Sequence, residues 1–98
     1  MLDVWNRVEA LKGKTLSTLS RGKRFTIVAV LDDRVQFVPE DSTGTVRWFP
    51  REGIEYFANL TFKPGELTAS RIVQERPSTR NGSYVAAIVY EITRGDGG

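Results

Sequence analysis

The apolar residues of this chain follow two patterns, and the change between them falls near Pro50. Between residues 15 and 49, apolar and polar residues tend to alternate, which is the period of a β-strand. After residue 50 the apolar residues recur at intervals of three and four, which is the period of a helix. We therefore predict an α+β fold in which a small antiparallel sheet of three to four strands precedes a largely helical second half.

The alternating half predicts a meander of short strands. Residues 24–31 alternate most clearly, with Phe25, Ile27, Ala29 and Leu31 on one face. Apolar residues on the other face as well are typical of a central strand. Asp32 and Asp33 predict a tight turn into the next strand, so these two strands form a hairpin. Strands are predicted over residues 15–19, 24–31, 34–39 and 45–49.

One helix is predicted before the sheet, over residues 2–12. Its apolar residues recur at three-residue steps, and we expect Trp5 to anchor it in the core. Gly13 can take the left-handed conformation that ends a helix. Three helices are predicted after the sheet, over residues 50–60, 68–75 and 83–93.

Pro50 is expected in the first turn of the second helix, where its missing N–H costs nothing. Gly53 would weaken that helix, which indicates either close packing or a late helix start. Thr68 suits the N-cap of the third helix, and Pro77 limits its length.

Residues 83–93 allow two interpretations. Asn81-Gly82 is a strong turn pair, so this segment could form a β-hairpin with residues 71–76. We favour a helix, because its apolar residues recur at three and four and Asn81 or Ser83 can cap it. Two helices here could form a helix-turn-helix that reads DNA. The long connector and the largely apolar second helix favour the alternative of two packed helices joined by a loop.

Composition excludes more functions than it suggests. The 98 residues contain no Cys and no His, which removes thiolate nucleophiles, imidazole bases and most zinc ligands. We therefore expect that the protein is not an enzyme and that it has no metal site and no cofactor. The length predicts a single domain over residues 1–94 with a disordered tail over residues 95–98. Charges near the N-terminus and the lack of long apolar runs predict a cytoplasmic protein with no membrane partner.

Positive charge is concentrated in one segment, although the net charge is only +2. Residues 10–31 contain five cations and no carboxylate. This segment could attract a polyanion, or it could simply be a solvated loop with charged strand ends. The candidate anion-binding residues here are Lys12, Lys14, Lys23 and Arg24.

A second candidate site is the sequence Arg47-Trp48-Phe49-Pro50-Arg51, in which two cations flank two aromatic residues. An exposed strand of this kind could stack the bases of a single-stranded nucleic acid and contact its phosphates. The strand alternation favours the simpler interpretation, in which Val46 and Trp48 face the core and Arg47 points to solvent.

The chain also resembles a loose family of small, uncharacterised prokaryotic domains. The resemblance covers about residues 11–92 and rests on these elements: Leu11-Lys12-Gly13-Lys14-Thr15, Phe25 with Val28, Ser42-Thr43-Gly44, Arg47-Trp48-Phe49-Pro50-Arg51 with Ile54-Glu55, and the run from Arg80-Asn81-Gly82-Ser83-Tyr84 to Ile88. It implies a strand-rich first half and a helical second half, and no established activity.

If those shared positions form a site, backbone N–H groups at two helix starts and nearby arginines would bind an anion. The candidates are Ser42, Thr43, Arg47, Arg51, Arg80, Asn81, Ser83 and Tyr84. Our prediction is a small non-catalytic binding module that binds DNA or RNA or is accessory to a nucleic-acid-processing system. The alternative is a protein-interaction module, either a homodimer or a binder of another protein, with no nucleic-acid role.

Overall fold

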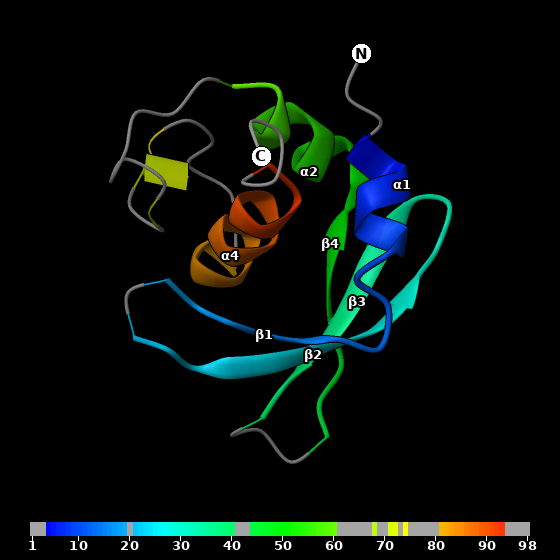
Figure 1. The fold of residues 1–98 in the computed structure, drawn as a ribbon, viewed down its shortest axis with the longest axis vertical. Helices are drawn as coiled ribbons and strands as arrows, with labels where there is room; N and C mark the ends of the chain where they lie inside the picture. Colours follow the sequence, from blue (N-terminus) through cyan, green and yellow to red (C-terminus); the bar gives the residue numbers. More distant parts are fainter. Residues whose placement is uncertain are drawn as a thin grey trace.

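A computed structural model describes residues 4–19, 21–40, 44–60, 68, 71, 72, 74 and 81–93 of the chain (Figure 1). A helix precedes four strands and further helices follow them, which confirms the α+β class. The elements are α1 Val4–Glu9, β1 Thr15–Ser17, β2 Arg24–Val30, β3 Arg34–Pro39, β4 Arg47–Pro50, α2 Arg51–Ala58 and α4 Gly82–Thr93.

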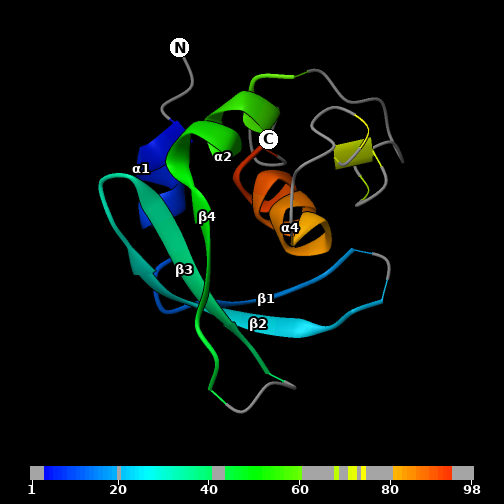
Figure 2. The same cartoon turned by 180° about the vertical axis from the view of Figure 1, so that it is seen from behind.

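The four strands form one antiparallel sheet in the order β1-β2-β3-β4, as the meander prediction required. The N–H of Leu31 donates to the carbonyl of Arg34 at 2.8 Å, which confirms the tight turn at Asp32 and Asp33. Sheets twist because of backbone chirality, and this one curves around α4 (Figures 1 and 2). Its concave face therefore holds the core.

Helix α4 occupies that concave face, which decides the ambiguity of residues 83–93 in favour of a helix. The ring of Tyr84 lies 5.0 Å from that of Phe25 and 5.2 Å from that of Phe37. Seven side chains of α4 are buried, whereas a helix that reads a groove must expose one face. No helix-turn-helix is shown by the described residues, and α4 is the central helix of the core.

Helices α1 and α2 complete the core at the end of the sheet near the β2–β3 turn (Figure 1). Trp5 is buried, as expected, and its indole N–H donates to the carbonyl of Leu31 at 3.0 Å. Helix α1 ends at Glu9, earlier than predicted. Gly13 has φ +84° and pairs with Ile27 of β2, so residues 10–13 form a turn into the sheet.

The join between β4 and α2 differs in one detail from the prediction. Pro50 is the last residue of β4 and the N-cap of α2, with an extended ψ of 144°, so the helix begins at Arg51. Gly53 reflects close packing: a Cβ there would lie 2.9 Å from Cζ of Phe49 and closer still to Cε2. The ring of Phe49 thus packs directly against Gly53 in α2.

Strand β2 is a central strand, but its alternation is interrupted. Its register with β3 shifts between Ile27 and Ala29, so Val28 is an extra residue in a β-bulge. After the bulge, Val30 packs against the core, and Leu31, which was expected on the same face as Phe25 and Ile27, is exposed. The predicted face of Phe25 and Ile27 therefore does not continue to residue 31.

The third predicted helix lies mostly outside the described residues. Thr68 accepts a hydrogen bond at its Oγ1 from the N–H of Arg71 at 3.2 Å, which confirms the predicted cap. Ile72 is fully buried and belongs to the core. The bounds of this helix and the predicted tail at residues 95–98 lie outside the described residues.

Candidate nucleic-acid interface

The convex face of the sheet is the surface opposite α4. Residues that are directly paired across antiparallel strands share a face, so the register assigns this surface residue by residue. From β1 to β4 its members are Thr15, Ser17, Arg24, Thr26, Ala29, Arg34, Gln36, Val38, Trp48 and Pro50. In the described part of the chain, no helix covers this face (Figures 1 and 2).

Trp48 lies on the convex face, so the expectation that it faces the core is wrong. Trp48 lies opposite Gln36 in the β3–β4 register and is 50% exposed, and Val46 is 51% exposed. The neighbouring Phe49 is instead the core residue, only 7% exposed. The physical reason is the packing of Phe49 on Gly53, which turns odd-numbered positions of β4 inward and Trp48 outward.

Arg34 is the cation that contacts Trp48 on this face. It lies diagonally across from Trp48, because Arg34 pairs with Pro50 and Gln36 pairs with Trp48. The guanidinium carbon of Arg34 lies 4.7 Å from the centre of the Trp48 ring, which is a cation–π contact. Sequence reasoning missed Arg34, because its position next to Trp48 depends on the β3–β4 register.

Asp33 binds the same guanidinium through both carboxylate oxygens. Nε of Arg34 donates to Oδ1 at 3.1 Å, and Nη2 donates to Oδ2 at 3.0 Å. These hydrogen bonds hold the pKa of the Asp33 carboxyl below its ordinary value and raise the pKa of Arg34. Asp33, Arg34 and Trp48 thus form one connected group, which we call the Arg34 clasp.

The two arginines that flank the β4–α2 join lie at opposite ends of β4 and have different partners. Nη1 of Arg47 donates to Oδ1 of Asn81 at 3.0 Å, and its guanidinium lies over the ring of Tyr84. The structure therefore brings these three predicted site residues together. Tyr84 itself is buried, and Asn81 has φ +59°, so the group also fixes the start of α4.

Arg51 belongs to the other end of the sheet. Its Nε donates to Glu55 at 3.2 Å and its Nη1 to the carbonyl of Asp32 at 3.2 Å. Its guanidinium also lies over the ring of Trp5. The predicted anion pocket therefore does not combine Arg51 with the start of α4. Arg80, Ser42 and Thr43 lie outside the described residues, and Ser83 is half-buried in the first turn of α4.

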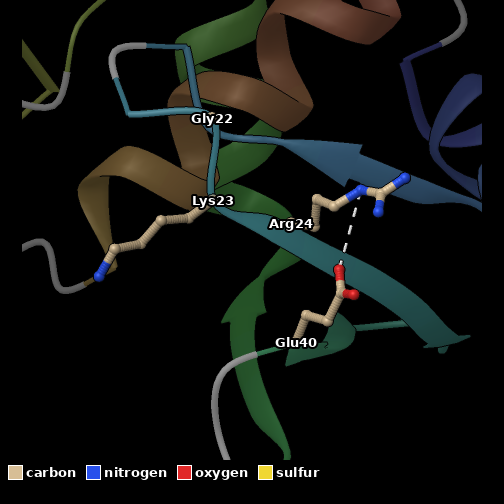
Figure 3. A pocket seen from close by; sticks show the side chains of 4 residues that line it. All are labelled: Gly22, Lys23, Arg24 and Glu40. Carbon is tan, nitrogen blue, oxygen red and sulfur yellow. Dashed lines mark ion pairs between the residues drawn. The ribbon is translucent and has the colours of Figure 1, made fainter.

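The basic residues of the first segment lie at both ends of β1, with Lys12 and Lys14 before it and Lys23 and Arg24 after the turn into β2. Lys12, Lys14, Lys23 and Arg24 are all exposed. A hollow at the start of β2 is lined by Gly22, Lys23, Arg24 and Glu40 (Figure 3). Arg24 pairs with Glu40 at 3.8 Å, and Lys23 points away from this pair (Figure 3). The carboxylate within the hollow makes it a poor anion pocket, whereas the surrounding cations remain at the surface.

The charged residues of the four strands are all positive. The residues of β1 to β4 include Arg24, Arg34 and Arg47 but no carboxylate. Two of these arginines, Arg24 and Arg34, lie on the convex face with Trp48. Chemically this face offers an aromatic ring for stacking, guanidinium groups for phosphates, and hydroxyl and amide groups from Thr15, Thr26 and Gln36.

Comparison of the chain with protein-family models, with curated proteins and with solved structures found no match. Within the described residues, no helix is long and apolar enough to span a membrane. The same part of the chain has no group of three or more acidic side chains that could hold a metal ion. The resemblance to small prokaryotic domains therefore stays a prediction, and the proposal below rests on geometry.

Proposed function

We propose that this protein is a small, non-catalytic module that binds single-stranded nucleic acid on the convex face of its sheet. The observation that carries the proposal is the half-exposed Trp48 beside Arg34 on a sheet face that no described helix covers. An indole presented on a rigid strand is a stacking platform for an unpaired base. A cytoplasmic location is part of this proposal.

The choice of a single strand over a duplex follows from the shape of the protein. Reading a duplex through its major groove needs an exposed helix or a two-stranded ribbon that fits the groove. Helix α4 is buried, and the convex face is four strands wide. A base that has left its stack can instead lie on Trp48, while an adjacent phosphate contacts Arg34. Phosphates further along the strand can reach Arg24, which lies on the same face at the other end of β3.

The first experiment measures binding by fluorescence anisotropy. Labelled single-stranded DNA and RNA of about 12 nucleotides, and a matched duplex, are titrated at several salt concentrations. We expect single strands to bind more tightly than the duplex, with a log–log salt slope of about −0.7 per phosphate contacted. Equal affinity for the duplex, or no binding of single strands at low salt, would contradict the proposal.

The decisive variant is Trp48→Ala. Loss of one base–aromatic stack should weaken single-strand binding by about 1–3 kcal/mol, while Trp48→Phe keeps a stacking ring and most of the affinity. Tyr90→Ala is the matched control, because Tyr90 is an aromatic residue of α4 with similar exposure, 43% against 50% for Trp48. Circular dichroism confirms that each variant is folded. An unchanged affinity of Trp48→Ala would remove this face from the proposal.

The alternative, a homodimer or another protein partner, uses the same region. Val28 in the β2 bulge and Val46 just before β4 are exposed, as is Trp48. Exposed apolar side chains gathered on one region are typical of protein interfaces. Light scattering distinguishes the two: a dimer that Trp48→Ala dissociates, together with no binding of nucleic acid, would favour the alternative.

A further inference from the structure

The side chain that holds Arg34 in place belongs to Asp33, which is negatively charged like a nucleic-acid phosphate. Asp33 accepts two hydrogen bonds from its guanidinium, at 3.1 and 3.0 Å, in the fork geometry that arginine also offers to phosphate. The same guanidinium lies over Trp48. The two groups expected to contact a ligand are therefore already occupied by each other and by Asp33.

This arrangement can open at low cost. The side chain of Asp33 is 67% exposed and that of Arg34 is 37% exposed. Exposed ion pairs contribute little to stability, because water and salt screen them. A phosphate that arrives at the convex face can therefore replace the Asp33 carboxylate on Arg34 without unfolding any part of the sheet.

We propose that Asp33 is an intramolecular competitor of the nucleic-acid phosphate, which keeps Arg34 over Trp48 until a single strand displaces it. This inference rests on the proposed function and adds a regulator to the same site. Asp33 is a positioning residue in the free protein, and its competition lowers the affinity for single strands. On binding, phosphate takes its place on Arg34, and a base takes the place of the guanidinium on the indole.

The test compares Asp33→Asn with Asp32→Asn. The two residues are neighbours in one turn, and each substitution removes one negative charge while keeping a side chain that suits a turn. Only Asp33 forms the clasp with Arg34. The probe is the labelled single strand of about 12 nucleotides used above.

We expect Asp33→Asn to bind the single strand about two- to fivefold more tightly than the wild type. Its salt slope should stay close to that of the wild type, because Arg34 contacts the same phosphate in both complexes. Asp32→Asn should change the affinity less than Asp33→Asn and leave the slope unchanged. Equal effects of the two variants, or weaker binding by Asp33→Asn, would overturn the inference.

A second measurement tests the clasp without any ligand. The indole N–H groups of Trp5 and Trp48 give two signals in a ¹H–¹⁵N spectrum, and the signal lost in Trp48→Phe identifies Trp48. We expect Asp33→Asn to shift the Trp48 signal and Asp32→Asn to leave it in place. No shift in Asp33→Asn would show that Asp33 does not position Arg34.

Failure of this inference differs from failure of the proposed function. If single strands do not bind, or if Trp48→Ala binds as tightly as the wild type, the proposed function fails. If single strands bind and need Trp48, but the two aspartate variants behave alike, only the competitor role of Asp33 fails.

Discussion

The two faces of the sheet are made from the same strands, yet one is closed and the other is open. On the concave face, Phe25, Ile27 and Phe37 are fully buried in the core, and the rings of Phe25 and Phe37 contact Tyr84 of α4. On the convex face, Trp48 is half exposed and its contact is with a cation. Because successive residues of a strand point to opposite faces, stability and recognition can be assigned to alternate positions of one segment.

This difference means that substitutions on the two faces should have separable effects. A change on the concave face removes buried apolar area and leaves a cavity, so it lowers the free energy of unfolding. A change on the convex face alters what the surface can bind, with little effect on packing. Strand β3 offers the sharpest comparison, since Gln36 and Phe37 are neighbours on opposite faces.

The largest effect we expect is that of Phe37→Ala. Phe37 is fully buried against the rings of Phe25 and Tyr84, so its truncation should lower the free energy of unfolding by about 3–5 kcal/mol. The neighbouring Gln36→Ala should change it by no more than about 0.5 kcal/mol. Urea denaturation followed by circular dichroism measures both. Similar losses in the two variants would show that the faces are not separable.

Gly53→Ala tests how the β4–α2 join sets the two faces, and its effect should be intermediate. Alanine favours a helix by up to about 1 kcal/mol over glycine. Here its Cβ would meet the ring of Phe49, so we expect a net destabilisation of about 1–3 kcal/mol. In a Phe49→Leu background, Gly53→Ala should lower the free energy of unfolding by less than it does in the wild type. A higher free energy of unfolding in Gly53→Ala than in the wild type would contradict the close packing of Phe49 against Gly53.

Features set by neighbouring residues could be predicted from the sequence. The strand positions, the turn at Asp32 and Asp33, the left-handed Gly13 and the cap at Thr68 all depend on local backbone preferences. The helical state of residues 83–93 was also predictable, because its period of three and four outweighed the turn signal of Asn81-Gly82.

Features set by contacts between distant segments could not be predicted in this way. Trp48 points outward because the adjacent residue, Phe49, is the one that packs against Gly53. The bulge at Val28 breaks the alternation that was extended to Leu31. The place of Arg34 beside Trp48 needs the register of β3 with β4. Gly53, four residues after Phe49, was a usable signal that Phe49 packs on the helix.

The smallest effect we expect concerns the protonation of Asp33 on the convex side. Hydrogen bonds from Arg34 hold the pKa of Asp33 below its ordinary value of 3.8. Because the pKa in the folded state is the lower one, the clasp contributes to stability above the ordinary value, and this contribution is lost as the pH falls through the lowered pKa. The other charged groups at this turn are Asp32 and Arg51, and Arg51 bonds to the backbone carbonyls of both aspartates.

Carboxyl NMR signals followed during acidification measure this shift. We expect the midpoint of Asp33 to rise in Arg34→Gln, because the variant loses the charged donor. The Trp48 indole signal of the wild type should move over the same pH interval as Asp33, because protonation releases Arg34 from the ring. The amide spectrum shows whether the protein stays folded over that interval. An identical Asp33 midpoint in wild type and variant would mean that the open face is not organised by this ion pair.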